Sequence, residues 1–308
     1  MLKKTDKLLY AAAAILLLTY AVSYSKKLSS TDKRVSVKSA LVNPENKDKI
    51  TSFTLQDNNG LLNFQKKEGF WCLYEENENY SVPASNKLVE DFLNEMIKIH
   101  NMYKISDPNM SKKTDFSLDS KYFPAETQIS FKYMLSDGRD YNLLFGNKDF
   151  SQANRYISAE NNASVYEVEN TFEPYLTTNV QNWSEPYIIS QQVFGSISEE
   201  DVQNVDFNGK KNIKINVQKL LELRHGGLFS IPSRLISSVS FLDMSNRTDE
   251  MNIYLGNKNF IDFAFVKISD EAYCLIAAYY DSTKSEPVYE AYMKISLWTY
   301  NKIKEIIL

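Results

Sequence analysis

Two stretches of the chain decide how it is expected to fold: ISFKYMLSDGRDYNLLFGNKDF at residues 129–150 and VSFLDMSNRTDEMNIYLGNKNF at residues 239–260. They align without a gap at an offset of 110 residues and share eight identities in 22 positions. Self-similarity at a fixed spacing is the sequence signature of a repeated structural unit. We therefore expect a duplicated unit in which the two stretches occupy equivalent antiparallel strands.

The similarity continues on both sides of these stretches. Val-Tyr-Glu at 165–167 recurs at 288–290, and residues 48–67 resemble residues 200–219, with strand–turn–strand expected in both. The recurrent Gly-Asn-Lys, at 146–148 and 256–258, is compatible with a ligand loop or with a positive-φ turn that leaves a strand. Its presence in both copies favours the turn.

Local signals predict mostly strands, joined as hairpins. Turn residues separate strand-like runs at Asp57–Gly60, Asp137-Gly138 and Asn208-Gly209. Apolar residues at helical spacing after Ser85, a helix-capping residue, predict an amphipathic helix over 86–101. Shorter helices are expected over 217–223 and 296–306. The predicted fold class is α+β, with two tandem units of mostly antiparallel sheet and helices on one face.

The N-terminus predicts a membrane anchor. Residues 8–24 read LLYAAAAILLLTYAVSY, without a charge, between lysines on both sides. A helix of this length spans roughly 25 Å, just short of a hydrocarbon core of about 30 Å, and snorkelling lysines can supply the difference. A cleaved signal peptide ending near Ala21-Val22-Ser23 is the alternative.

These features divide the chain into four parts. Residues 1–26 are expected to form a cytoplasmic tail and transmembrane anchor, and residues 27–45 a polar stalk. The first α+β unit is expected over 46–185 and the second over 186–308. The predicted location is the inner (cytoplasmic) membrane, with a single pass and the folded region outside the cytoplasm.

Composition excludes one class of partner. The chain has 308 residues, 35 basic against 39 acidic, and a net charge of −4. Nucleic-acid binding needs a concentrated basic surface, so no nucleic-acid partner is expected. The 20 Tyr and 17 Phe favour β structure with aromatic packing.

Few residues are suited to chemistry. Cys72 and Cys274 are the only cysteines, and both lie in apolar runs, where buried free thiols are commoner than a disulfide, which stays the alternative. His100 and His225 are the only histidines. The motif Arg-His-Gly-Gly at 224–227 is similar to the oxyanion loop of esterases, but no G-x-S-x-G elbow accompanies it, and a helix end is the simpler interpretation.

Metal and nucleotide sites are not predicted either. The acidic clusters at 75–78 and 199–201 lack the alternating oxygen spacing of a calcium loop, and solvated turns explain them better. No Walker A sequence and no G-x-G-x-x-G are present. We therefore assign no catalytic, cofactor-binding or metal-ligating residue, and expect no enzyme activity and no cofactor.

The order of these features resembles a bacterial family known as domain of unknown function 4340. The residues that carry the resemblance are Trp71-Cys72-Leu73, the helix over 86–101, Tyr122-Phe123-Pro124, Asp137-Gly138, Phe145-Gly146, Val165–Val168 and Thr171-Phe172. The resemblance covers most of 46–185 and, through the repeat, much of 200–308. It implies an extracytoplasmic region and association with ABC-type exporter components of the gliding-motility kind, with no catalytic residues to carry over.

Two functions from different classes follow from these observations. The first is a non-enzymatic, membrane-anchored accessory or scaffold protein that binds envelope or ABC-exporter proteins. The alternative is a hydrolase or binding protein for an envelope polymer, which would use carboxylates that are paired only in the fold. A cleft with two facing carboxylates of perturbed pKa would favour the alternative.

Overall fold

The computed structural model describes residues 35–74, 80–105, 113–118, 128–160, 164–229 and 247–307. Within them the chain forms two antiparallel sheets, one of ten strands and one of five. Only two α-helices exceed five residues among the described elements, so the predicted α+β class is wrong and the fold is mostly antiparallel β. The alternating apolar runs between tight turns form strands almost throughout, which leaves little of the chain for helices.

The ten-stranded sheet is formed by strands between residues 35 and 169, about the first half of the described chain. Its strands lie in the order β1 (Val35–Ser39), β6 (His100–Lys104), β10 (Tyr166–Glu169), β9 (Asn154–Ala159), β8 (Asp140–Lys148), β7 (Ile129–Leu135), β2 (Ile50–Gln56), β3 (Leu61–Lys67), β4 (Phe70–Tyr74) and β5 (Val82–Pro83). The predicted hairpin turns at Asp57–Gly60 and Asp137-Gly138 join β2 to β3 and β7 to β8. β1 lies within the predicted stalk and pairs with β6.

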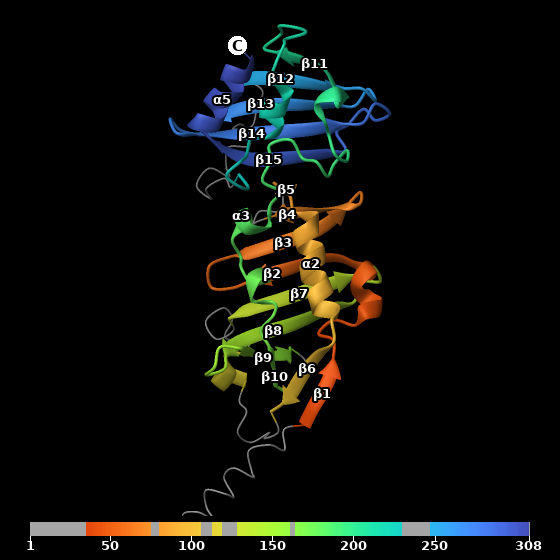
Figure 1. Ribbon diagram of the computed structural model, residues 1–308, viewed down its shortest axis with the longest axis vertical. Helices are drawn as coiled ribbons and strands as arrows, with labels where there is room; N and C mark the ends of the chain where they lie inside the picture. Colours follow the sequence, from red (N-terminus) through yellow and green to blue (C-terminus); the bar gives the residue numbers. More distant parts are fainter. Residues whose placement is uncertain are drawn as a thin grey trace, which may run out of the picture.

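Helix α2 (Asn86–Ile97) lies across this sheet (Figure 1). Ser85 caps it as predicted, by accepting a hydrogen bond from the Leu88 N–H at 3.4 Å. The helix ends before residue 101 because the chain turns at Lys98 and begins β6 at His100. Phe92 of α2 packs on Phe131 of β7, with ring centroids 5.0 Å apart, in a core rich in aromatic rings.

The five-stranded sheet lies in the C-terminal part of the chain. Its strands are ordered β11 (Val202–Phe207), β12 (Arg247–Leu255), β13 (Phe260–Lys267), β14 (Ala272–Tyr280) and β15 (Tyr289–Ser296). The predicted helices appear as α4 (Val217–Leu221) and α5 (Leu297–Ile307). Tyr300 of α5 stacks on Tyr273 of β14 at 3.9 Å and donates a hydrogen bond to the buried Asp249 of β12.

Short elements complete the described chain. They are the 3-10 helices η1 (Pro44–Lys49), η2 (Lys113–Phe116), η4 (Glu173–Tyr175) and η5 (Glu199–Asp201), and the single-turn helix α3 (Val180–Trp183).

The predicted pair of duplicated units is wrong, because sheets of ten and five strands are not two copies of one unit. β8 and β12 do align at the offset of 110, but Gly-Asn-Lys at 146–148 continues β8, whereas 256–258 form the turn after β12. The residues that follow 208–209 form no named strand, unlike β3. Residues 239–246, in the second copy, lie outside the described residues.

The two glycines of this motif have different physical roles. A Cβ on Gly146 would lie 2.0 Å from the Phe116 carbonyl oxygen, so only glycine permits this close approach. Around Gly256 the nearest such atom lies at 3.5 Å, and the positive φ of the turn belongs to Lys258, at 69°. The turn interpretation of the motif therefore holds for the second occurrence only.

The two sheets follow one another along the long axis of the molecule, with β5 facing β15 (Figure 1). The Tyr292 N–H donates to the Ser81 carbonyl oxygen at 2.8 Å, directly before β5. Residues 183–192, which we call the connector, run along the same boundary: the Glu185 N–H donates to the Pro83 carbonyl oxygen at 2.8 Å. Most of the buried hydrophobic side chains of both sheets belong to one continuous core.

The predicted anchor over residues 8–24 lies outside the described residues. Among the residues that the structure does describe, no helix is long and apolar enough to cross a membrane.

Candidate functional site

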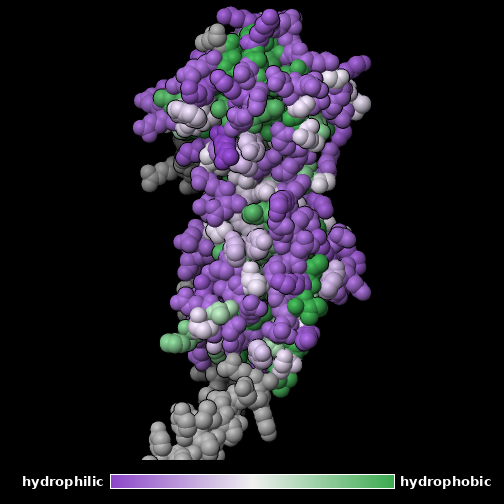
Figure 2. Space-filling model, in the orientation of Figure 1, coloured by the Kyte–Doolittle hydropathy of each residue, from purple (hydrophilic) through white to green (hydrophobic). Residues whose placement is uncertain are grey.

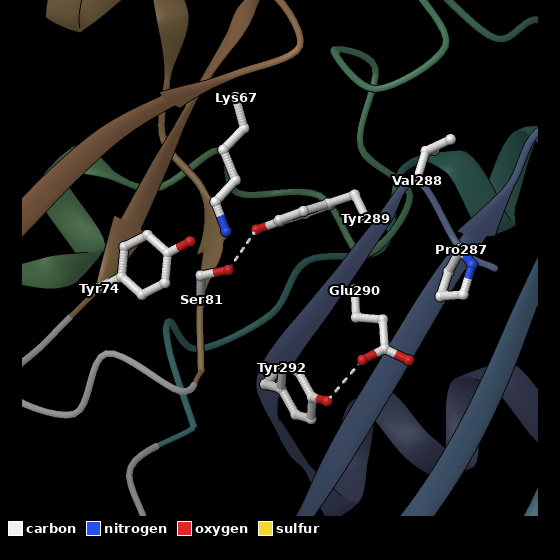
Figure 3. Close-up of a pocket in the computed structure, with 8 residues that line it drawn as sticks. All are labelled: Lys67, Tyr74, Ser81, Pro287, Val288, Tyr289, Glu290 and Tyr292. Atoms are coloured by element: carbon white, nitrogen blue, oxygen red, sulfur yellow. Dashed lines mark hydrogen bonds between the residues drawn. The ribbon is translucent and has the colours of Figure 1, made fainter. Parts of the chain in front are cut away.

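A pocket of about 290 Å³ lies at the boundary between the two sheets (Figure 3). We call it the junction pocket. Its lining comes from both sheets: Lys67 of β3, Tyr74 of β4 and Ser81 on one side, and Pro287, Val288, Tyr289, Glu290 and Tyr292 on the β15 side. The pocket therefore exists only where residues far apart in the sequence meet.

Local sequence explains how each strand presents its residue. Glu68 and Gly69 both have positive φ, 45° and 97°, and form the tight turn between β3 and β4. This turn places Lys67 at the end of β3, and β4 carries Tyr74 at its far end. β4 is buried along its whole length, as expected for a strand in the apolar run Phe-Trp-Cys-Leu-Tyr.

Hydroxyl groups converge on one side of the pocket. The Ser81 and Tyr289 hydroxyls share a hydrogen bond of 3.0 Å, and Ser81 is 5% exposed. Figure 3 shows the Tyr74 hydroxyl and the Lys67 amine pointing toward this pair. Tyr74 is 4% exposed, and its hydroxyl is buried with no hydrogen-bond partner among the described residues.

The charges of the pocket are separated. The Lys67 amine lies 5.2 Å from the centre of the Tyr74 ring, and no described carboxylate lies within ion-pair distance of it. On the opposite side, Glu290 accepts a hydrogen bond from the Tyr292 hydroxyl at 2.9 Å. The pocket therefore offers donors at one side and a carboxylate at the other.

The thiol nearest to this pocket is not activated. Burial raises the pKa of Cys72 to about 11, although the nearby Lys67 charge and a hydrogen bond from Tyr289 oppose the shift. Burial also raises the pKa of Tyr289 well above its usual range. Near neutral pH both groups keep their protons, so the arrangement is suited to hydrogen bonding and not to nucleophilic attack. Cys72 and Cys274 are both buried free thiols.

The histidine singled out in the sequence has a structural role. The Gly227 N–H donates to His225 Nδ1 at 2.9 Å, and His225 Nε2 lies 2.6 Å from the Glu185 carbonyl oxygen. Together these bonds assign the ring hydrogen to Nε2. Burial lowers the pKa of His225, so the neutral ring links the connector to the glycines beside β15. The other histidine, His100, bonds the Glu95 carbonyl oxygen at 2.9 Å through Nε2.

A buried carboxylate lies in the connector. Glu185, 7% exposed, accepts hydrogen bonds from the Ser190 hydroxyl at 2.6 Å and from the Gln191 N–H at 3.0 Å. The Ser190 N–H in turn donates to the Tyr279 hydroxyl of β14 at 2.9 Å. Burial raises the pKa of Glu185. This cluster attaches the connector to the five-stranded sheet.

The acidic cluster at 199–201, predicted to be a solvated turn, is exposed to solvent. Asp201 accepts hydrogen bonds from both the N–H and the hydroxyl of Ser198, at 2.7 Å each, and caps η5. The other acidic cluster, at 75–78, lies outside the described residues. Within the described ranges, no group of three or more His, Cys, Asp or Glu side chains is placed to hold a metal ion.

One row of acidic side chains is formed only by the pairing of the strands. Asp262 of β13 and Glu290 of β15 lie in the same row of the sheet, on either side of Ala278. Burial raises the pKa of Asp262, and the charges of Glu250 and Glu290 add to this shift while Arg247 opposes it. No local motif could have revealed this row, because its members come from separate strands.

Comparison with known proteins gives one match. The chain matches the family model described as Domain of unknown function (DUF4340) over residues 71–227, about half of its length. The matched segment runs from β4 through α2, the connector and α4, and includes Tyr74 and Ser81 of the junction pocket. No curated protein and no solved structure matches the chain.

Proposed function

We propose a function from one premise: the chain belongs to the family described as Domain of unknown function (DUF4340). The protein is a non-enzymatic, membrane-anchored accessory or scaffold protein of a bacterial envelope complex, and the complex contains an ABC-type exporter. Its partners are the membrane, through the single apolar stretch at 8–24, and proteins of that complex.

One observation carries this proposal. β1, the first described strand, lies at one end of the long axis, and the five-stranded sheet lies at the other (Figure 1). A chain tethered ahead of β1 would hold the ten-stranded sheet near the membrane and extend the five-stranded sheet away from it. A tether of this kind raises the effective concentration of a binding surface near other membrane proteins.

The surface near β1 also supports docking. Val35 is 57% exposed and Ile99, just before β6, is 61% exposed. Figure 2 shows hydrophobic side chains toward this end of a mostly hydrophilic face, as well as at its opposite end. Val35 and Ile99 lie at opposite ends of the β1–β6 pair, and exposed apolar surface along one edge supports a protein or membrane contact.

A second candidate function has one observation in its favour. Asp262 and Glu290 are two strands apart in one row, which corresponds to about 9.6 Å at the usual strand spacing. Carboxyl groups roughly 6.5–9.5 Å apart are typical of inverting glycosidases. An envelope-polymer hydrolase would use these two residues, with the raised pKa of Asp262 suited to the acid. No described pocket includes both carboxylates, so we rank this function second.

Affinity purification tests the first function against the second. The full-length chain, solubilised with detergent from membranes of its own host, is expected to recover exporter and envelope proteins. A chain lacking residues 1–26 is expected to recover far less. Recovery of neither, together with cleavage of an envelope polymer that Asp262→Asn abolishes, would overturn the accessory role in favour of the hydrolase.

Protease treatment of spheroplasts tests the topology. The folded region is expected to be digested or released while the membrane is intact. If it survives until the membrane is permeabilised, it faces the cytoplasm and the proposed topology is wrong.

A further inference from the structure

We propose that the junction pocket binds a small ligand through a carboxylate group of that ligand. Lys67, Tyr74 and the hydroxyl pair of Ser81 and Tyr289 would hold the carboxylate, and Glu290 and Tyr292 would face the rest of the ligand. This site goes beyond the accessory function, since it requires neither the anchor nor an exporter.

The Tyr74 hydroxyl is the first reason. A buried hydroxyl without a hydrogen bond destabilises the folded state by roughly 1–3 kcal/mol, so such groups are rare unless a ligand or water completes them. Two other buried side-chain atoms in the described residues lack a partner, Trp71 Nε1 and Arg247 Nε, but neither residue lines the pocket. Of these three residues only Tyr74 lines the pocket, and its hydroxyl is directed toward Ser81 and the Lys67 amine (Figure 3).

The charge of Lys67 is the second reason. Nine lysines of the described chain lie within 4.0 Å of a carboxylate. Lys67 is not among them, and it lines the pocket. The ammonium group and the Tyr74 hydroxyl are both donors aimed at the same space, and Ser81 and Tyr289 can direct one further hydroxyl hydrogen to it. Convergent donors with one positive charge are suited to an oxyanion.

The class of oxyanion follows from the charge balance and the size. Glu290 lies in the same pocket as Lys67, so their formal charges cancel and a dianionic phosphate would be disfavoured relative to a carboxylate. Tight phosphate sites also tend to use arginine, and none lines this pocket. A volume of about 290 Å³ is at the small end for ligand pockets and fits one amino-acid or monosaccharide unit.

Calorimetric titration of the full-length chain in a non-ionic detergent tests the site. The probes are acetyl-alanyl-alanine, the same dipeptide with a C-terminal amide, glucuronate and inorganic phosphate. We expect saturable binding of acetyl-alanyl-alanine, of glucuronate, or of both. If the dipeptide acid binds, its amide is expected to bind at least about tenfold more weakly, because the amide lacks the hydrogen-bonded charge. The tighter of the two acids identifies a peptide or a sugar acid as the source of the carboxylate.

Two variants and a matched control assign the binding to this pocket. Tyr74→Phe and Lys67→Met keep most of the side-chain packing and are each expected to weaken the acid about tenfold. Lys66→Met is the control, because the Lys66 amine lies over the Trp71 ring, at 5.8 Å, and does not line the pocket.

Three results would overturn the proposal. They are an absence of saturable binding by either acid, equal binding of the dipeptide acid and its amide, and unchanged binding in Lys67→Met. Tighter binding of phosphate than of either acid would show that the carboxylate assignment is wrong. None of these results bears on the exporter interaction, which is measured separately.

Discussion

Two polar clusters lie at the boundary between the sheets, and they differ in whether their hydrogen bonds are complete. In the connector, Glu185 accepts hydrogen bonds from the Ser190 hydroxyl and the Gln191 N–H. Both ring nitrogens of His225, beside the connector, are bonded to backbone groups. In the junction pocket, the buried Tyr74 hydroxyl has no hydrogen-bond partner among the residues that the structure describes. Complete clusters stabilise a fold, whereas an incomplete one in an open pocket indicates a ligand. The same residue types therefore serve structure on one side of the boundary and binding on the other.

The largest expected effect comes from the connector carboxylate. Glu185→Ala leaves the Ser190 hydroxyl and the Gln191 N–H without their acceptor, and we expect the free energy of unfolding to fall by about 3 kcal/mol. Glu185→Gln keeps an acceptor and is expected to lose about 1 kcal/mol. Urea denaturation measures both. The exposed Glu200→Ala is the control, expected within about 0.5 kcal/mol of the unmodified protein; an equal loss there would break the comparison.

The second-largest loss of stability is expected from removal of the His225 imidazole. His225→Ala removes the bonds to the Glu185 carbonyl oxygen and from the Gly227 N–H, so we expect a loss of about 2 kcal/mol in the same denaturation experiment. Arg224→Ala, next to it, removes only an exposed contact with the Tyr187 ring and is expected to cost about 0.5 kcal/mol. A variant at His225 that is as stable as the unmodified protein would show that the connector is not held by this ring.

The pH dependence of stability tests the role of the His225 ring. Because burial lowers the pKa of His225, the stability that its neutral form contributes is complete above the unfolded pKa, near 6.5, and is lost as the pH falls toward the folded pKa. Glu185 acts in the opposite direction, since its raised pKa favours the protonated form. The informative quantity is therefore the difference between the unmodified protein and His225→Ala. Between pH 7 and pH 5 the unmodified protein should lose more stability; parallel pH curves would contradict this.

Much of the strand content could be predicted from the sequence, because its signals are local. The Asp57–Gly60 turn, the Ser85 cap and the helix of α5 each depend on neighbouring residues and are present as predicted. The arrangement of the strands depends on distant pairings, and the repeat suggested two equal units where the sheets have ten and five strands. β1 illustrates the same limit, since a short polar strand within the predicted stalk is ordered by its pairing with β6.

The candidate site could not be predicted at all. The Ser81 and Tyr289 hydroxyls, which meet at 3.0 Å, are 208 residues apart in the chain. Tyr74 lies at the end of the apolar run that begins at Phe70, and that pattern indicates only a buried strand. The one available signal is Lys67 directly before a turn and a buried strand, and many exposed hairpins share it. Conversely, His225 belongs to a motif similar to an oxyanion loop, but both of its ring nitrogens bond backbone groups and its role is structural.

A matched pair of tyrosine variants tests the comparison most directly. Tyr279→Phe removes the acceptor of the Ser190 N–H in the connector, and Tyr74→Phe removes the unpartnered hydroxyl in the pocket. By urea denaturation without ligand, we expect Tyr279→Phe to lower the free energy of unfolding by about 1–2 kcal/mol and Tyr74→Phe to leave it unchanged or raise it slightly. If Tyr74→Phe is instead destabilised as much as Tyr279→Phe, the Tyr74 hydroxyl has a structural partner and the distinction between the two clusters is wrong.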